Sequence, residues 1–339
     1  MNILFSVHAY PPRHNAGGEM YMHNMAKYFV KCGHKVRVLV NESQYQGWNV
    51  AYELDGVEVW PRNRSLENFF IWADRVITHL GFTSWTVAVT HKFKKPVFFV
   101  VHNTHRYSCV SDAEKPVGII YNCQAAKGRL NYPQPNIVFP PAVDYREYDL
   151  GQDPRKNEYI TLINLNENKG GRILYQIARA MPDKKFLAVK GGYDEQIIEE
   201  LPNVHHMDHT PNIREVYRQT RILLMPSEYE SWGMCATEAM ANGIPVICTP
   251  TFGLLENCGD AARYVGNPPP ADDKSAMPKV TGREDIDAWV REIRRLDNKK
   301  TYLHQSNLSR ERARFHDPLA RYESLLAFVT NPNDPKYLP

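Results

Sequence analysis

The amino-acid sequence predicts an α/β protein with two domains, each built on a doubly wound parallel sheet. The length of 339 residues favours two domains of ordinary size over one. Apolar runs of strand length alternate with helical segments in two series, which a proline-rich stretch separates. Such alternation is typical of parallel sheets with helices on both faces.

The first series opens the chain with a βαβ unit. The apolar run ILFSVHAY is followed by the loop PPRHNAGG and by a segment of helical spacing, EMYMHNMAKYFVKCGH. Gly33 ends this helix, and KVRVLVN supplies the second strand. Further runs at residues 75–78, 96–101 and 118–121 predict three more strands.

Residues 132–157 hold five prolines and show little helical period, so we interpret them as the connection between the domains. The second series then begins. Its predicted strands lie in EYITLINLN, KFLAVKGG, ILLMPS and PVICTP, and its predicted helices lie at about residues 171–181, near residues 194–200 and in TEAMANG. Loops that follow strands of such sheets are the expected ligand sites.

Composition excludes several classes of protein. With 43% hydrophobic and 23% charged residues, the chain is neither disordered nor collagen-like. Its start lacks the features of a signal peptide, and no run of about 18 apolar residues occurs, so we expect a cytoplasmic protein without a transmembrane segment. The six cysteines are far apart and include no C-x-x-C pair, so we expect them to be reduced and mostly buried.

The segment PSEYESWGMCATE, at residues 226–238, carries the most informative chemistry. If Gly233 opens a helix, the amides of residues 233–235 form an anion site between the carboxylates of Glu230 and Glu238. A nucleotide sugar needs this combination, because amides hold the diphosphate while carboxylates accept hydrogen bonds from sugar and ribose hydroxyls. The alternative is that Glu230 caps a helix and Glu238 lies on the surface.

The ordered string from this segment through AMANGIPVICT resembles the family 4 retaining glycosyltransferases, which have the GT-B fold. Pro11, Pro12, Gly17 and Gly18 resemble the glycine-rich loop of the family's acceptor domain. VVHNT, FPPAVDYREY and RFHDPLARYESLLAFV resemble its strand-end histidine, its hinge and its terminal helix. The resemblance implies two Rossmann-like domains facing a cleft: an acceptor domain at 1–145, a nucleotide-sugar domain at 146–316, and a helix at 317–331 that crosses back to the first domain.

Motif and resemblance together predict the site residues. The expected donor-binding residues are Gly17, Gly18, Asn164, Lys169, Lys190, Glu230, Trp232, Gly233, Met234, Cys235 and Glu238, and the expected catalytic residues are His102, Glu230 and Lys169. The sequence departs from the family at Asn164, where an Arg is expected to grip the diphosphate with Lys169. Lys190 or Arg172 could replace that Arg, or either could face solvent. Outside the family context, a histidine at the end of an apolar strand is usually packed in the core or bonded to the backbone.

Metal binding is not supported. His205, His206 and His209 lie in a predicted strand end and turn, and Asp285 and Asp287 begin a predicted acidic helix. We therefore expect no metal and no cofactor, with a UDP or GDP sugar as donor substrate. The expected reaction is a metal-independent transfer of the sugar to a hydroxyl, with retention of configuration and with the departing phosphate accepting the proton.

The acceptor is left open as a glycan, a lipid-linked glycan or an anionic molecule such as modified-base DNA. Residues 1–150 hold 16 basic and 12 acidic residues, a net charge of +4, and eight of the 13 histidines. The basic residues that permit an anionic acceptor are Arg62, Arg64, Lys92, Lys94, Lys95, Arg106, Lys127 and Arg129, although a solvated basic surface explains them as well.

Two rival functions lack their sequence motifs. A nicotinamide enzyme needs G-x-G-x-x-G, which neither NAGGEM nor KGGYDE supplies, and no G-x-x-x-x-G-K-[ST] of a P-loop enzyme occurs. A sugar-nucleotide epimerase or a non-catalytic GT-B protein that binds glycans stays open.

Overall fold

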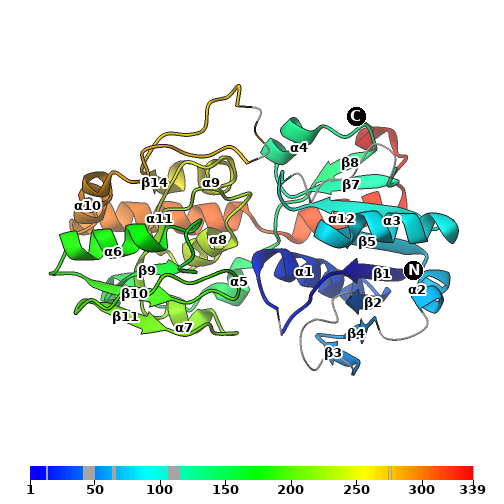
Figure 1. Cartoon of the computed structure of the whole chain (residues 1–339), viewed down its shortest axis with the longest axis horizontal. Coiled ribbons are helices and arrows are strands. Elements are labelled where there is room, and N and C mark those ends of the chain that lie inside the picture. The colour runs from blue at the N-terminus through cyan, green and yellow to red at the C-terminus, as the bar shows by residue number, and fades with distance from the viewer. Residues whose placement is uncertain are drawn as a thin grey trace. The chain divides into compact units, whose positions relative to one another are not determined.

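A computed structural model describes residues 1–12, 14–40, 50–62, 66–105, 115–273, 275 and 277–338 (Figure 1). Arg64, Arg106 and Cys109 lie outside these residues. The chain divides into two compact units, which are Met1–Ala142 with Pro318–Pro339, and Val143–Asp317. The sequence placed the corresponding boundaries after residues 145 and 316, and the acceptor and donor roles of the two units stay predictions.

The first unit is built on an eight-stranded sheet in the order β3-β4-β2-β1-β5-β6-β7-β8. Neighbouring strands are parallel except β3 and β4, which pair antiparallel. Because β2 and β5 lie on opposite sides of β1, the strand order reverses at β1 and β5. The strands are β1 (Asn2–Val7), β2 (Lys35–Val40), β3 (Tyr52–Leu54), β4 (Val57–Pro61), β5 (Arg75–His79), β6 (Val97–Val101), β7 (Gly118–Tyr121) and β8 (Asn136–Val138).

The end of the chain belongs to this first unit (Figure 1). Leu325 and Phe328 of the last helix are fully buried in a core shared with Phe29 of the first helix. A Cβ on Gly118 would lie 2.7 Å from the Phe328 ring, so this strand needs a glycine where the helix packs. The helices are α1 (Gly17–Lys31), α2 (Leu66–Trp72), α3 (Thr83–Lys92), α4 (Gln124–Leu130) and α12 (Leu319–Thr330).

The second unit has a six-stranded, fully parallel sheet in the order β11-β10-β9-β12-β13-β14. Here the order reverses at β9 and β12. The strands are β9 (Tyr159–Ile163), β10 (Lys185–Val189), β11 (Val204–Met207), β12 (Thr220–Met225), β13 (Val246–Cys248) and β14 (Ala262–Tyr264). Buried strands of this kind read as continuous apolar runs, which explains why the sequence predicts most of them.

Side-chain caps fix the starts of several helices in this unit. Asp285 accepts a hydrogen bond from the Ala288 amide at 3.0 Å, and Thr251 and Asn298 cap two further helices. The acidic helix start expected at Asp285 is therefore confirmed. The helices are α5 (Tyr145–Tyr148), α6 (Gly171–Ala180), α7 (Arg214–Tyr217), α8 (Met234–Ala241), α9 (Phe252–Cys258), α10 (Ile286–Arg295) and α11 (Lys299–Phe315).

One expectation about local structure is wrong. Residues 194–200 form no helix, because the Gln196 side chain bonds the Gly191 and Leu165 amides and the Ile197 amide donates to the Leu165 carbonyl. The boundary between the two units lies between Ala142 and Val143, within the proline-rich stretch that the sequence indicates as the connection. This stretch also contributes β8 to the first sheet and α5 to the second unit.

Five cysteines lie among the described residues, and none of the five forms a disulfide. Cys123, Cys248 and Cys258 are buried, whereas Cys32 is exposed. No helix in the described ranges has both the length and the apolar character needed to cross a bilayer.

Candidate functional site

The candidate site of the second unit lies where its strand order reverses. The loops after β9 and β12 leave the carboxyl ends of adjacent parallel strands, which pair from Thr220 to Leu224. In open α/β sheets this switch point is where ligands bind. The first loop carries Lys169 and the second carries Glu230, so the fold brings together two predicted residues that are 61 positions apart.

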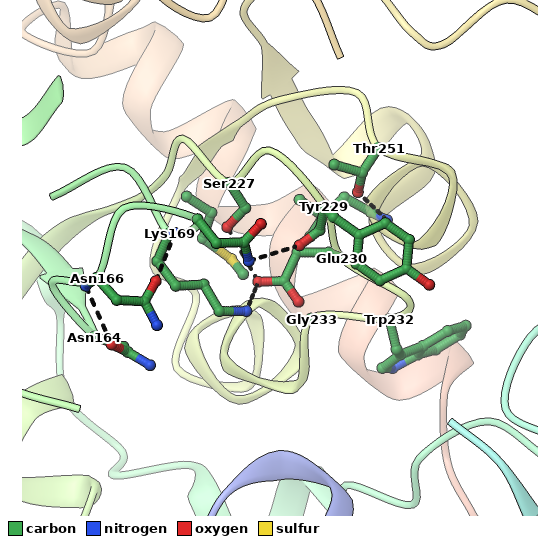
Figure 2. A network of polar contacts seen from close by, with 12 residues as sticks. Asn164, Asn166, Lys169, Ser227, Tyr229, Glu230, Trp232, Gly233 and Thr251 are labelled. Carbon is green, nitrogen blue, oxygen red and sulfur yellow. Dashed lines mark hydrogen bonds and ion pairs between the residues drawn. The ribbon is translucent and has the colours of Figure 1, made fainter. Parts of the chain in front are cut away.

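Lys169 and Glu230 form an ion pair (Figure 2). The exposed fractions of their side chains are 18% and 10%, and the Ser227 hydroxyl donates a further hydrogen bond to Glu230 Oε1 at 3.1 Å. Burial alone would lower the pKa of the Lys169 ammonium, but the Glu230 carboxylate raises that pKa above its ordinary value. The lysine is therefore charged at neutral pH and has a defined position.

The two loops contact each other directly. The Glu228 amide donates to the Asn168 carbonyl at 2.7 Å, and a Cβ on Gly170 would lie only 2.6 Å from the Pro226 ring. Gly170 has a φ of 86°, so the position requires glycine both for its backbone conformation and for the close approach. These contacts hold Lys169 beside Glu230.

Helix α8 begins immediately after the second loop. Gly233 is its N-cap with a φ of 83°, and no side chain caps the helix. The Ala236 amide is the first to bond within the helix, to the Gly233 carbonyl, so the preceding amides lack intrahelical partners. Glu230 bonds Lys169 and Ser227 and does not cap this helix, so the capping alternative is wrong.

Trp232, Met234 and Cys235 surround this helix start. The Trp232 ring is 3% exposed and meets the His316 ring edge-on, with 5.2 Å between ring centroids. Burial raises the pKa of the Cys235 thiol to about 12, so this thiol is not a nucleophile at neutral pH. Their predicted role in donor binding is untested.

Glu238 lies one turn further along α8 and is buried. Its Oε2 atom accepts a hydrogen bond from the Tyr217 hydroxyl at 2.7 Å, and its exposed fraction is 7%. Burial raises the pKa of this carboxyl from 4.5 to about 7, although hydrogen bonds from Tyr217 and Tyr148 oppose the shift. The alternative that places Glu238 on the surface is therefore wrong.

Asn164 is a structural residue of the first loop. It has a φ of 70°, which asparagine tolerates better than most residues, and its Oδ1 atom accepts from Gln196 Nε2 at 3.0 Å. The two candidates for the missing cation are engaged elsewhere. Lys190 pairs with Asp208 at 2.7 Å and Arg172 with Glu167 at 2.7 Å, and all four side chains are exposed.

Among the described residues, no group of three or more His, Cys, Asp or Glu side chains is arranged to hold a metal ion. His205 and His206 lie in β11, and the Asp285 side chain caps α10. Their positions agree with the structural interpretation of both motifs.

In the first unit, His102 follows β6 and belongs to a buried polar cluster. Its Nε2 atom lies 2.8 Å from Nδ1 of His79, which ends β5. Burial lowers the pKa of His102 to about 4, so its imidazole is neutral at physiological pH. His102 is 9% exposed, which leaves both its predicted catalytic role and the core alternative untested.

Glu19 is a member of this cluster that the sequence did not indicate. It lies in the first turn of α1, directly after Gly17 and Gly18, and is 2% exposed. Glu19 Oε1 is 3.1 Å from His8 Nε2, and Oε2 is 3.3 Å from His14 Nδ1. Burial alone would raise the pKa of Glu19, but the bonds from His14 and His8 lower it below its ordinary value.

Comparison with solved structures identifies the fold. The chain aligns with Anabaena Alr3699/HepE in complex with UDP-glucose at a TM-score of 0.74 and 15% identity, covering 98% of this chain and 100% of that one. It aligns with the sucrose-phosphate synthase of Thermosynechococcus elongatus at a TM-score of 0.72 and 15% identity, covering 97% and 98%. The fold is GT-B. The expected fold class is thereby confirmed.

Sequence comparisons agree with the GT-B fold. Residues 149–277, which carry both loops and α8, match the sequence model of a family described as glycosyl transferases group 1. The chain is 23% identical over 325 residues to the uncharacterized glycosyltransferase MJ1607 of Methanocaldococcus jannaschii, covering 76% of this chain and 82% of that protein.

Proposed function

We propose that this GT-B protein is a glycosyltransferase that moves a sugar from a nucleoside diphosphate sugar to an acceptor hydroxyl with retention of configuration. The observation that carries the proposal is the buried Lys169–Glu230 pair beside the uncapped start of α8. It places a cation, a carboxylate and helix amides together at a sheet's switch point. The match of residues 149–277 to glycosyl transferases group 1 supports the same class.

In the proposed reaction, Lys169 and the first amides of α8 stabilise the charge that develops on the departing diphosphate. The bond between the sugar's anomeric carbon and the phosphate oxygen breaks, and a bond to the acceptor oxygen forms. The acceptor's proton passes to the departing phosphate. These protein groups supply positive charge without a metal, which is why we propose a metal-independent reaction.

In this proposal, Glu230 and Glu238 accept hydrogen bonds from different hydroxyls of the donor. Glu230 lies beside Lys169 and orients hydroxyls of the transferred sugar, whereas Glu238 lies one turn further along α8 and serves the ribose. The donor is a UDP or GDP sugar. UDP-glucose is the ligand named for the Anabaena structure, which supports testing UDP sugars first.

The proposed acceptor is a glycan, a lipid-linked glycan or an anionic molecule, modified-base DNA among them. Several basic residues of the first unit have partners of their own. Lys92 pairs with Glu67 at 3.0 Å, Lys95 donates to the Ile71 carbonyl, and Arg62 lies over the Trp85 ring. Salt separates the acceptor classes, because binding of a polyanion weakens steeply between about 50 and 200 mM salt while binding of a neutral glycan does not.

The test of the proposed function is donor binding and turnover in the full chain. Wild-type protein is titrated calorimetrically with UDP, GDP and their glucose and mannose sugars, and turnover is followed as release of the nucleoside diphosphate. Glu230→Gln loses a charged hydrogen bond and is expected to weaken donor binding and turnover by roughly 10–150-fold. Proton NMR of the product then reports whether the anomeric configuration is retained.

Glu228→Gln is the matched control for Glu230→Gln. Glu228 lies in the same loop, but it pairs with Lys279, whose side chain is 64% exposed, and exposed pairs contribute little. Equal kinetics in both variants, with folding intact, would contradict the assignment of Glu230. Donor binding with epimerisation and no transfer would favour the epimerase alternative, and binding without any turnover would favour a glycan-binding protein.

A further inference from the structure

Arg283 is a buried cation at the junction of the two site loops, and sequence motifs gave no indication of it. Arg283 is 8% exposed. Its Nη1 atom donates to the Pro226 carbonyl at 3.3 Å and to the Asn168 carbonyl at 3.4 Å. Asn168 directly precedes Lys169, and Pro226 opens the loop that carries Glu230, so one guanidinium group bridges both loops.

The backbone holds Arg283 firmly in this position. Trp289, which is fully buried in the core of the second unit, donates from Nε1 to the Arg283 carbonyl at 2.8 Å. Asn267 and Thr281 exchange backbone hydrogen bonds shortly before it, and Gly282 has a φ of 73°. The pairing of Asn267 with Thr281 and the Trp289 hydrogen bond therefore fix the backbone on both sides of the Arg283 side chain.

The charge of Arg283 is incompletely compensated. Its carboxylate partner is Glu284, which bonds Nε at 3.1 Å from a side chain that is 68% exposed. Within the described residues, Nη2 has no hydrogen-bond partner. Burying a guanidinium without a buried counter-ion costs free energy, and such a charge favours a bound anion nearby.

The candidates that the sequence offered do not supply the second cation that the resemblance implies for the diphosphate. Asn164 stands where the resemblance expects an Arg, and Lys190 and Arg172 are exposed and paired with Asp208 and Glu167. We propose that Arg283 is a positioning residue that holds the Lys169 and Glu230 loops together and supplies the second positive charge of the diphosphate site. This inference rests on the proposed function, because it assumes a diphosphate ligand.

The expected effect depends on the charge of the ligand. A unit charge about 10 Å from a charged ligand, at an effective dielectric constant of about 20, changes the affinity by roughly tenfold. An uncharged nucleoside does not experience this effect. A purely structural role would weaken the binding of both ligands alike.

The experiment measures the affinities of UDP and uridine, and in parallel of GDP and guanosine, for wild type, Arg283→Gln and Arg283→Lys. Arg283→Gln is expected to weaken nucleoside diphosphate binding roughly tenfold and to leave nucleoside binding unchanged. Arg283→Lys keeps the charge, so its diphosphate affinity is expected within about threefold of wild type. Arg291→Gln is the control, because Arg291 is 62% exposed and pairs with Asp285 on the surface of α10.

The proposal is overturned if Arg283→Gln weakens nucleoside and diphosphate binding equally, or weakens neither. If Arg283→Gln does not fold, Arg283→Lys decides alone, and a tenfold loss of diphosphate affinity in that variant overturns the role of charge. Wild-type protein that binds neither UDP nor GDP would contradict the proposed function itself. If the wild type binds UDP or GDP and Arg283→Gln binds it with the same affinity, only the role of Arg283 is contradicted.

Discussion

Glu238 links the stability of the second unit to pH. Burial raises the pKa of this carboxyl to about 7 in the folded protein, against 4.5 in an unfolded chain. Between these two values the folded protein keeps a proton that the unfolded chain has released. The free energy of unfolding therefore falls as pH rises, which is opposite to the usual behaviour of a carboxylate in a salt bridge.

The size of this effect follows from the pKa difference. Each pKa unit corresponds to about 1.36 kcal/mol, so raising the pKa from 4.5 to about 7 corresponds to about 3 kcal/mol. This stabilisation is fully present below pH 4.5 and is lost as pH rises through about 7. Glu238→Gln keeps the size and an acceptor for the Tyr217 hydroxyl but removes the titration.

Urea unfolding between pH 4.5 and 8 measures the effect directly. The wild type is expected to lose about 3 kcal/mol relative to Glu238→Gln across this range. The ¹³C resonance of the Glu238 carboxyl, assigned by its absence from the variant's spectrum, should titrate with a midpoint near 7. Parallel stability curves, or a carboxyl midpoint below 5, would refute the reasoning. Glu228→Gln, which removes an exposed ion pair with Lys279, controls for the loss of one negative charge.

Three further predictions test other parts of the two units. Lys169→Ala is expected to weaken diphosphate binding by roughly 10–150-fold. Dialysis against EDTA is expected to leave wild-type turnover unchanged. Loss of activity in EDTA that magnesium or manganese restores would contradict a metal-independent reaction. His102→Ala is expected to lower turnover more than donor affinity, and ¹⁵N NMR should show the wild-type imidazole neutral above about pH 5. A lower melting temperature of the variant, with normal activity per folded molecule, would support a core role instead. Gly253→Ala places a Cβ 2.5 Å from the Glu230 carbonyl oxygen and should weaken donor binding. Gly128→Ala is the control, because a Cβ there would have no neighbouring atom of the described residues within 4 Å. Equal donor binding by the two variants would contradict a role for the close packing of Gly253 against Glu230.

The sequence predicts most of the strands because each is a short, buried, apolar run between turn residues. It fails at residues 194–200, where local spacing suggests a helix. There the Gln196 side chain bonds Asn164, Leu165 and Gly191, and these contacts with the loop after β9 replace helical hydrogen bonds. A contact across about 30 residues leaves no periodic signal in the sequence.

The sequence likewise indicates some residues of the candidate site and misses others. Glu230 and Glu238 are predicted because they belong to an ordered motif, and Lys169 is predicted from the resemblance to a glycosyltransferase family. Arg283 and Glu19 are not predicted, since no motif considered in the sequence assigns either of them a role, and the burial of each depends on elements distant in the sequence. Tertiary structure also distinguishes two lysines that both follow strands of one sheet. Lys190 is exposed and pairs with Asp208, whereas Lys169 is largely buried and pairs with Glu230.

The two units have different electrostatic environments at the carboxyl ends of their strands. In the second unit, the Lys169–Glu230 ion pair and Arg283 lie at the loops of the switch point, beside the uncapped start of α8. Under the transferase proposal, the two cations and the helix amides stabilise a diphosphate that gains charge as it leaves. In the first unit, the pKa of Glu19 is lowered and that of His102 is lowered to about 4, so a carboxylate and a neutral imidazole coexist in one buried cluster. A neutral imidazole can orient a hydroxyl by hydrogen bonding without adding charge. Under the transferase proposal, the second unit therefore stabilises the leaving group with cations, whereas the neutral His102 imidazole positions the acceptor hydroxyl.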